Sequence, residues 1–309
     1  MSIVVTGASG FIGRAVVQRL LDEGRRVVSL GRTDPGIPGL AHVTWDVREA
    51  AGPEVLRALP YLETVIHCAG IVDDWADADE LHAVNVIGTR HVLDAFPDQR
   101  IIHLSSTEVY DPQRDHDRLY EEAGPVAEAR YPSGPELSKA LAETVIQRVR
   151  PQTLVLRPSV VYGPGDTTLF PRLRAIIEDG QLRIPGGGRK RITLTHIDTL
   201  VEAMLAGIAR PDVSGPINVG DPKPYVLKEA LLTYLARAGE ERVVLDEVPA
   251  DLAMARAWYA ERRARKKGTR PPITRTTIRQ VIHERTYDLT RLEQQLGCSG
   301  VQHLAPRRA

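Results

Sequence analysis

Three glycines near the start of the chain have the spacing at which a backbone can bind a diphosphate. Gly7, Gly10 and Gly13 follow an apolar run at residues 2–5 and precede residues 14–21, whose apolar side chains recur at helical spacing. In this context of strand, turn and helix, Gly7 would allow the tight turn, Gly10 would let phosphates approach the backbone, and Gly13 would let helix and strand pack closely. The helix dipole would favour the negative charge of the phosphates. The alternative is a glycine-rich turn that binds no ligand.

Small and hydroxyl-bearing residues end two further strands that the sequence predicts. Cys68, Ala69 and Gly70 follow the apolar run 64–67, and the hydroxyls of Ser105, Ser106 and Thr107 follow the run 101–104. Ligands of open parallel sheets bind outside the carboxyl ends of the strands. We therefore expect the small residues to leave room for a ribose or a nicotinamide, and the hydroxyls to lie where the ligand binds.

The end of the second expected strand indicates which dinucleotide is bound. Many dinucleotide folds have an acid there that binds the ribose 2′-hydroxyl, whereas this chain has Gly31 and Arg32 after residues 26–30. The glycine opens space and the arginine suits a 2′-phosphate, so we expect NADP(H) to be preferred, with NAD(H) as the alternative. Asp46, after the third strand at residues 42–45, could accept a hydrogen bond from the adenine amino group or serve only in a turn.

The overall composition predicts a soluble α/β protein of the cytoplasm. Of the 309 residues 42% are hydrophobic, and 40 Lys and Arg balance 40 Asp and Glu, so net charge favours neither nucleic acid nor an anionic membrane. Cys68 and Cys298 suggest no disulfide framework or metal site, and neither a signal peptide nor a membrane span is expected. The basic stretch 256–270 is predicted to be a solvated helix and loop rather than a nucleic-acid helix, because few aromatic residues interrupt it.

Strands and helices are expected to alternate along the first half of the chain. Beyond residues 2–5, strands are expected at 26–30, 42–45, 64–70, 101–106 and 152–157. This pattern predicts an α/β fold, a doubly wound parallel Rossmann sheet in residues 1–166 to which residues 191–220 return. Residues 167–190 and 221–309 would form a smaller C-terminal substrate-binding lobe. Residues 111–132, charged and broken by prolines, are predicted to be a loop, and Ser133 and Glu136 have capping-box spacing.

Taken in order, these pieces resemble the extended short-chain dehydrogenase/reductase superfamily over nearly the whole chain. The motifs that carry the resemblance are Thr6-Gly7-x-x-Gly10-x-x-Gly13, His67-Cys68-Ala69-Gly70, Asn85-Val86-x-Gly88-Thr89, Ser105-Ser106-Thr107-Glu108-Val109-Tyr110, Ser138-Lys139 and Arg157-Pro158-x-x-Val161-Tyr162-Gly163-Pro164-Gly165. Each motif is weak alone, but their common order is specific. The tail, with Pro271-Pro272-Ile273 and Tyr287-Asp288-Leu289, is similar to the sterol-dehydrogenase-like branch.

The resemblance implies an NAD(P)(H) site and assigns residues to it. The residues expected at the cofactor are Gly7, Ser9, Gly10, Phe11, Ile12, Gly13, Arg32, Asp46, Val47, Ala69, Gly70, Ser105, Lys139, Pro158 and Val160. By register Ser106 matches the family's catalytic hydroxyl, with Thr107 as second candidate, and Lys139 matches the lysine that binds the nicotinamide ribose. Ser106, Tyr131 and Tyr162 are expected to contact the substrate. Asn85 is expected to be a structural support, no metal is implied, and the oligomeric state stays open.

One position departs from the family. The catalytic tyrosine of typical members lies four residues before the lysine, one helical turn away on the same face, and that position is Pro135. Losing a positioned acid costs a factor of about 10²–10⁴, but orientation of the hydride donor can contribute more. Three alternatives remain: another group such as Tyr131, Ser106, Thr107 or water serves in its place, the substrate assists its own reduction, or the protein binds NADP without turnover.

These observations predict an NADPH-dependent ketoreductase that acts on a bulky ketone, of the aromatic polyketide type found in antibiotic biosynthesis. Reductases of the superfamily that lack the tyrosine include enzymes that tailor aromatic polyketides such as angucyclinones, and the absent tyrosine carries this resemblance. A sugar-nucleotide epimerase or dehydratase, or a sterol-type dehydrogenase, is the first alternative. A non-enzymatic NADP sensor or scaffold is the second. The partner in each case is a small molecule.

Overall fold

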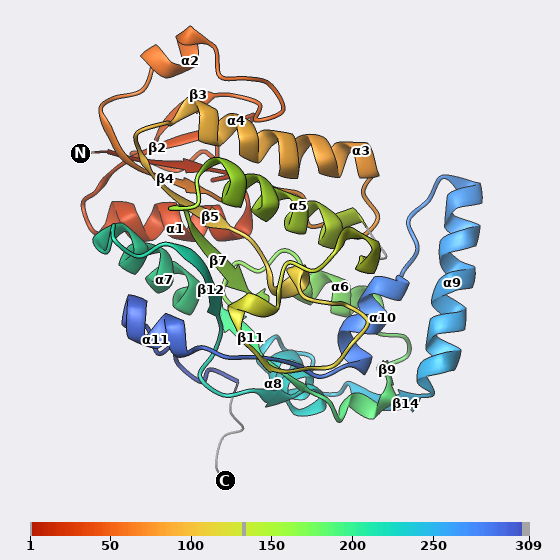
Figure 1. The fold of residues 1–309 in the computed structure, drawn as a ribbon. Coiled ribbons are helices and arrows are strands. Elements are labelled where there is room, and N and C mark those ends of the chain that lie inside the picture. The colour runs from red at the N-terminus through yellow and green to blue at the C-terminus, as the bar shows by residue number, and fades with distance from the viewer. Residues whose placement is uncertain (1, 132–133, 305–309) are drawn as a thin grey trace.

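A seven-stranded parallel sheet runs through the larger part of the computed structural model, which describes residues 2–131 and 134–304 (Figure 1). The strands are β1 (Ser2–Thr6), β2 (Arg26–Gly31), β3 (Ala41–Thr44), β4 (Leu62–His67), β5 (Arg100–Leu104), β7 (Leu154–Pro158) and β12 (Gly215–Val219). Their order is β12-β7-β5-β4-β1-β2-β3, and every neighbouring pair is parallel. The order reverses at β1 and β4, the switch point at which such sheets bind ligands. The predicted doubly wound Rossmann sheet is confirmed.

Helices cover both faces of this sheet. One face carries α1 (Phe11–Asp22), α7 (Ile197–Ala209) and α11 (Thr290–Leu296). The other carries α2 (Pro53–Arg57), α4 (Gly88–Ala95) and α5 (Gly134–Val149), and α4 continues α3 (Ala78–Leu81) and the π-helical segment η1 (His82–Ile87). π-Helical turns are rare and frequently mark functional sites.

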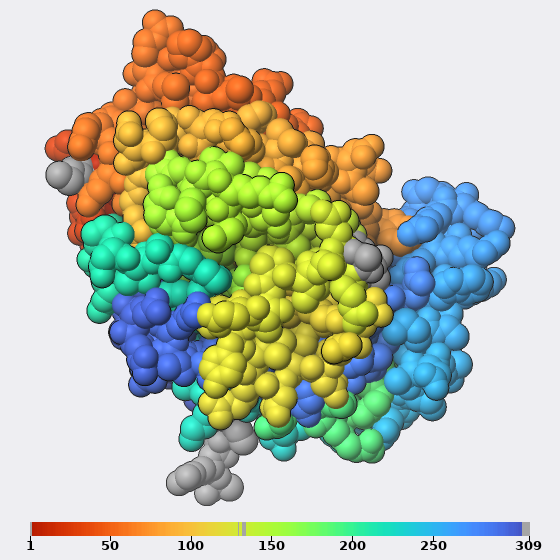
Figure 2. All heavy atoms as spheres, in the orientation of Figure 1, coloured from red at the N-terminus to blue at the C-terminus, as the bar shows by residue number. Residues whose placement is uncertain are grey.

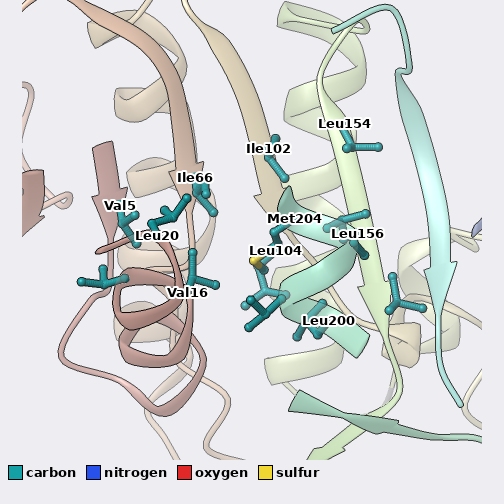
Figure 3. Close-up of a cluster of buried hydrophobic side chains, with 14 of the residues drawn as sticks. Val5, Val16, Leu20, Ile66, Ile102, Leu104, Leu154, Leu156, Leu200 and Met204 are labelled. Carbon is teal, nitrogen blue, oxygen red and sulfur yellow. The ribbon is translucent and has the colours of Figure 1, made fainter. Parts of the chain in front are cut away.

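Alternate residues of each strand face opposite helical layers, which sets the position of the strand ends. Ile3 and Val5 belong to the core cluster on the side of α1 and α7, and Figure 3 shows Val5 beside Leu20 of α1, whereas Val4 belongs to the cluster of the opposite layer. In β7, Leu154 and Leu156 likewise face the first layer and Val155 the second. A slip of one residue would exchange the two faces. Because each buried aliphatic side chain contributes about 1.5–3 kcal/mol, this packing strongly fixes the register and hence the edge where the strands end.

The remaining segments form smaller sheets and helices below the carboxyl edge. The strands are β6 (His116–Leu119), β8 (Val160–Tyr162), β9 (Gln181–Pro185), β10 (Arg191–Ile192), β11 (Leu194–His196), β13 (Tyr225–Val226), β14 (Val244–Val248) and β15 (Arg285–Tyr287). The helices are α6 (Leu169–Ala175), α8 (Leu227–Arg237), α9 (Ala250–Lys267) and α10 (Arg275–Ile282), with short 3-10 turns η2 (Thr107–Val109), η3 (Glu121–Ala123), η4 (Glu128–Arg130) and η5 (Gly186–Gly188). A separate core around Leu182, Ile184 and Tyr225 supports them. The basic stretch falls on α9, which forms one edge of the molecule in Figure 2.

Two expectations about the chain's course need correction. The prediction of a loop over residues 111–132 is wrong at β6, which pairs in parallel with β15. The His-Asp-Arg-Leu sequence of β6 has no apolar alternation, so pairing with a distant strand overrides its weak local preference. The proposed domain boundaries stay a prediction, but α11, assigned there to the lobe, packs Leu292 and Leu296 into the core beneath the large sheet. Ser133 of the expected capping box lies outside the described residues.

None of the helices in residues 2–131 and 134–304 combines the length and the apolar character needed to cross a membrane.

Candidate functional site

In the glycine turn after β1, two of the three glycines have no space for a side chain. Gly7 has a φ of +72°, and a Cβ there would lie 2.6 Å from the amide nitrogen of Ala69. A Cβ on Gly13 would lie 2.2 Å from the carbonyl oxygen of Gly7. Around Gly10 the only described atom within 4 Å of such a Cβ is that same carbonyl oxygen, at 3.4 Å. The turn is thus closed toward β4 and α1 and open beside Gly10, as expected for a backbone that a diphosphate approaches.

The first turn of α1 offers amides to an anion. Gly10 is its N-cap residue and supplies no side-chain cap, and no acidic residue occupies the first turn. Ser9 and Gly10 are exposed, whereas Phe11 and Ile12 are half-buried. The opening amides of a helix have no intrahelical acceptor and carry the positive end of the dipole. The described residues therefore fit a bound dinucleotide, whose diphosphate this turn would hold.

Two arginines flank the end of β2, where the adenosine ribose would lie. Arg32 is exposed and has no ion pair within the described part of the chain, and a Cβ on the preceding Gly31 would meet no atom within 4 Å. Arg14 of α1 donates a hydrogen bond of 2.7 Å to the carbonyl oxygen of Pro35. The sequence reading did not single out Arg14, although its position directly after Gly13 was a signal. Asp46 is held by Arg48 through contacts of 2.6–3.1 Å that lower the pKa of the carboxyl group, beside the buried Val47.

The segment after β4 is fixed by Asn85, as expected of a structural support. The Asn85 amide accepts from the Ile71 amide at 2.8 Å and donates to the Ile71 carbonyl at 2.9 Å and to the Ser138 hydroxyl at 2.8 Å. These bonds join η1, the strand end and α5. Ala69 is positioned from the other side, since its amide donates to the Thr6 hydroxyl at 3.2 Å. Burial raises the pKa of the Cys68 thiol to about 12, so this cysteine stays a neutral thiol.

Lys139 lies between the ends of β4 and β5. Its ammonium group donates to the carbonyl oxygen of Leu104 at 3.1 Å, and a Cβ on Gly70 would lie 3.3 Å from its Nζ. Burial lowers the pKa of Lys139, and the nearby carboxylate of Glu108 opposes that shift. The structure thus brings the lysine to the edge that also carries the glycine turn, where a positive group can bind a ribose or stabilise an oxyanion.

Of the three hydroxyls at the end of β5, two are bonded within the fold and one is available to a ligand. The Ser105 hydroxyl donates to the buried carboxylate of Glu143, so it holds the strand end. Thr107 is buried and hydrogen bonds to Tyr287. Ser106 is half-buried, and its hydroxyl accepts a 3.1 Å bond from the Glu108 amide, which leaves its proton available to a ligand oxygen. Ser106 is therefore the best placed of the three to donate to a carbonyl.

Glu108 also lies at this edge, and no role for it is predicted from the sequence. Its position two residues after Ser106, beside the strand-end hydroxyls, was the signal in the sequence that could have indicated an acid here. The structure places Glu108 in η2, half-buried, with its carboxylate accepting a 2.6 Å bond from Gln280 of α10. Burial raises the pKa of Glu108, whereas the charge of Lys139 lowers it.

The two tyrosines expected near the substrate have committed hydroxyls. The Tyr131 hydroxyl donates to the carbonyl of Val109 and accepts from the Val126 amide at 2.9 Å, and its pKa is raised to about 12 by burial. The Tyr162 hydroxyl donates to Asp221 at 2.5 Å. These bonds argue against Tyr131 as the proton donor, and any contact of Tyr162 with substrate would have to use its ring.

Pro135 lies in the first turn of α5, four residues before Lys139 on the same helix. It is buried, and its carbonyl accepts a 2.8 Å bond from the Ser138 hydroxyl. Proline is tolerated there because a first-turn amide needs no helical partner. Farther along the edge, Pro158 is buried at the end of β7 and Val160 is exposed at the start of β8.

Within the described residues, a group of three side chains that could bind a metal lies elsewhere, beside the start of α7. Ligand atoms of His196, Asp198 and His303 lie within 4.8 Å of one another. The two imidazole rings stack with centroids 3.6 Å apart, and His196 caps α7 by accepting from the Asp198 amide at 3.3 Å. The arrangement is explained by ring packing and helix capping, so we assign no metal to it.

Known proteins resemble this chain in sequence and fold. The sequence model of the NAD dependent epimerase/dehydratase family matches residues 3–220. A 2-alkyl-3-oxoalkanoate reductase of Stenotrophomonas maltophilia is 29% identical over 262 residues, covering 79% of this chain and 77% of the relative. A 4-hydroxy-2-methyl-3-oxo-4-farnesyl-3,4-dihydroquinoline-1-oxide ketoreductase of Stigmatella aurantiaca is 26% identical over 317 residues, covering 97% and 92%.

The fold is also shared with solved structures. MoeE5 in complex with UDP-glucose and NAD superimposes with a TM-score of 0.73 at 21% identity, covering 98% of this chain and 95% of that one. A short-chain dehydrogenase/reductase superfamily protein from Agrobacterium tumefaciens with bound NAD gives 0.72 at 22% identity, covering 98% and 94%. Together with the family match and the motifs, these likenesses confirm the resemblance to short-chain dehydrogenases/reductases. The chain belongs to the NAD dependent epimerase/dehydratase family and is an NAD(P)-dependent oxidoreductase.

Proposed function

We propose that this protein is an NADPH-dependent ketoreductase that reduces a bulky, apolar ketone of the aromatic natural-product type. The observation that carries the proposal is the position of Lys139, whose ammonium lies beside Gly70 and the carbonyl of Leu104 at the edge that also holds the glycine turn. A buried lysine at that edge suits a reaction in which negative charge develops on an oxygen. The bound cofactor would supply a hydride from nicotinamide C4.

The described residues divide the remaining work. Gly7, Gly10 and Gly13 would hold the diphosphate, and Lys139 would bind the nicotinamide ribose. Ser106 would donate a hydrogen bond to the ketone oxygen, with Thr107 less favoured because it is buried against Tyr287. The smaller C-terminal lobe would shape the ketone's pocket. Such positioning of the reacting groups can supply much of the rate even without the tyrosine.

The names of two relatives support a ketone with an apolar neighbour. The compound in the first name has a 3-oxo group beside a 2-alkyl substituent. The compound in the second name has a 3-oxo group beside a 4-farnesyl substituent on a quinoline ring. Both names place a hydrocarbon chain on the carbon next to the ketone. We extend this substrate class to the present chain, with an aromatic polyketide as the first choice. Epimerases and dehydratases of the family begin by oxidising a sugar, a step that normally uses the tyrosine as base, and Pro135 disfavours it.

The preference for NADPH rests on the end of β2. Arg32 is exposed, lacks an ion pair in the described residues and follows a glycine that leaves the space open. Arg14 lies on the adjoining turn of α1. A 2′-phosphate would gain charge-assisted hydrogen bonds from these guanidinium groups, whereas a 2′-hydroxyl would gain little.

A substrate panel followed by NADPH absorbance tests the proposal. The panel would contain 2-tetralone and larger polycyclic ketones, and a 2-alkyl-3-hydroxyalkanoate assayed in the oxidative direction with NADP⁺. UDP-glucose would test the epimerase alternative and a 3β-hydroxysteroid the sterol alternative. We expect turnover with at least one ketone or 2-alkyl-3-hydroxy acid and none with UDP-glucose. Binding of NADPH with no turnover across the panel would instead favour a sensor.

Lys139→Met distinguishes a site lysine from a structural one. Because Met keeps the length and apolar stem but removes the charge, we expect the dissociation constant for NADPH to rise and turnover to fall. The control is Lys228→Met, a lysine on the outer side of α8. Unchanged NADPH affinity in Lys139→Met would overturn the placement of the cofactor.

A further inference from the structure

The reduction proposed above needs a proton on the ketone oxygen. In typical relatives a tyrosine supplies this proton, and in this chain the corresponding position is Pro135. Tyr131, the nearest tyrosine in sequence, has its hydroxyl bonded to the backbone of Val109 and Val126. We propose that Glu108, held by Gln280 of α10, is the catalytic residue that protonates the ketone oxygen. This inference rests on the proposed function and names an acid for the same site.

The position of Glu108 is set by the end of β5. Ser106 is the N-cap of η2, and its hydroxyl accepts from the Glu108 amide at 3.1 Å. The acid therefore follows, within two residues and one fixed turn, the hydroxyl that would bind the ketone. Lys139 lies at the same strand end, since it donates to Leu104, two residues before Ser106. Hydroxyl, ammonium and carboxyl thus share the carboxyl edge of β5, where the ligands of such sheets bind.

The carboxyl group is also fixed from the opposite side. Gln280 reaches it from α10 with a 2.6 Å bond from Nε2 to Oε1. This bond leaves Oε2 available to carry a proton toward the site. Gln280 is half-buried, and α10 is tied to the segment after β4 because Thr274 and Thr277 both bond to Asp74. Hydrogen bonds from η2 and from α10 therefore fix the position of Glu108 between the large sheet and the C-terminal segments, as expected of a preorganised catalytic group.

The charges around Glu108 favour a carboxyl group that can be protonated. Burial raises its pKa and is the largest influence, and Asp74 of the segment after β4 adds to the effect. Lys139 of α5, Gln280 of α10 and Arg172 of α6 act in the opposite direction. A general acid works best when its pKa is shifted toward the working pH, and a half-buried glutamic acid meets this condition better than an exposed one.

The proposed step balances as a reduction. The carbon–oxygen π bond breaks as the carbonyl carbon accepts the hydride, so the ketone is reduced while the nicotinamide is oxidised. The freed electron pair on oxygen forms an O–H bond with the proton of Glu108, and the O–H bond of the acid breaks. The resulting carboxylate is stabilised by Gln280 and the positive charge of Lys139, and it regains a proton from water before the next turnover.

Glu108→Gln and Glu108→Asp test the inference through the pH profile of kcat. A donor must be protonated, so wild-type kcat should be constant at low pH and fall as pH rises through the pKa of Glu108. Glu108→Gln should lower kcat by about 10²–10⁴, remove that alkaline decline and leave the NADPH dissociation constant within about twofold. Glu108→Asp should keep the decline at an intermediate kcat. The matched control Glu122→Gln removes an exposed carboxylate on η3 and should leave both constants unchanged.

Gln280→Leu separates a catalytic from a merely structural Glu108. Its hydrogen bond lowers the pKa of the acid, so its removal should move the alkaline decline to higher pH while substantial activity remains. If the wild-type enzyme is active and the kcat of Glu108→Gln is within threefold of the wild-type value, the role of Glu108 is overturned while the ketoreductase proposal stands. A wild-type protein that binds NADPH but reduces nothing would overturn the ketoreductase proposal, and the role of Glu108 with it.

Discussion

The guanidinium of Arg157 forms a two-point ion pair with the carboxylate of Glu143 beneath the candidate site. Nε donates to Oε1 at 2.9 Å and Nη2 to Oε2 at 2.6 Å, and the side chains are only 1% and 6% exposed. Arg157 also donates to the carbonyls of Glu121 and Gly124, while Ser105 donates to Glu143. The pair therefore joins β7, α5 and the segment of η3 to the strand end that carries Ser106 and Glu108.

We expect Glu143→Gln to destabilise the protein by about 3–5 kcal/mol, because it leaves the Arg157 charge buried without its counterion. Urea denaturation at neutral pH measures the change. Asp94→Asn is the control, since it breaks the exposed Arg90–Asp94 pair on α4, which contributes less than about 0.5 kcal/mol. Equal losses in the two variants would contradict the central role of the buried pair.

Arg32→Ala is expected to weaken NADPH binding about 10- to 100-fold and to leave NADH binding unchanged. The reason is the loss of charge-assisted bonds to a 2′-phosphate, worth about 1.5–3 kcal/mol. Fluorescence titration with each dinucleotide measures both constants. Arg26→Ala, at the opposite end of β2, provides the control. An equal loss of affinity for NADPH and NADH would show that Arg32 does not bind the 2′-phosphate.

Gly10→Ala and Gly13→Ala should have different consequences. The added methyl on Gly10 meets only the Gly7 carbonyl, at 3.4 Å, so the fold should tolerate it while the diphosphate loses its space. On Gly13 the methyl would lie 2.2 Å from that oxygen, and we expect a loss of stability of about 1–3 kcal/mol as well. Thermal unfolding without cofactor and NADPH titration distinguish the two effects. A destabilised Gly10→Ala that still binds NADPH normally would contradict the proposed diphosphate position.

Buried histidines should make the protein sensitive to mild acid. Burial lowers the pKa of His67 to about 3 and of His116 to about 4, and the pKa of His103 also lies well below 6.5. Unfolded histidines gain a proton near pH 6.5, whereas the folded groups do so only at lower pH. Stability is therefore complete above about pH 6.5 and falls below it, by about 1.4 kcal/mol per pH unit for each group, until the folded pKa is reached.

His103→Leu tests this origin. Neither ring nitrogen of His103 has a hydrogen-bond partner among the described residues, so the variant should be at least as stable at pH 7.5 and lose less stability between pH 6.5 and 5. His67→Leu is the comparison, because it also breaks the bonds to Thr6 and Thr89 and should be weaker at every pH. Urea unfolding at three pH values provides the data. An unchanged pH slope in His103→Leu would assign the acid sensitivity to other groups.

The sequence alone was sufficient for features that depend on neighbours in the chain. The apolar, β-branched run Ile3-Val4-Val5 predicts a strand, and the spacing of Gly7, Gly10 and Gly13 predicts the turn into α1. The relation of Pro135 to Lys139 needs only the period of one helix. Each of these follows from local geometry and the burial of apolar surface, which short stretches of sequence encode directly.

The tertiary structure alone decided which distant groups meet. Gln280 reaches Glu108 across 172 positions of the chain, β6 forms only because β15 lies beside it, and Tyr131 is removed from the list of proton donors by two backbone groups. Contacts of this kind depend on how complete helices and strands pack against one another. The resulting hydrogen bonds and burial determine the protonation state of each side chain. A carboxyl in a strand-end motif is therefore visible in the sequence, but its candidacy as an acid comes from the fold around it.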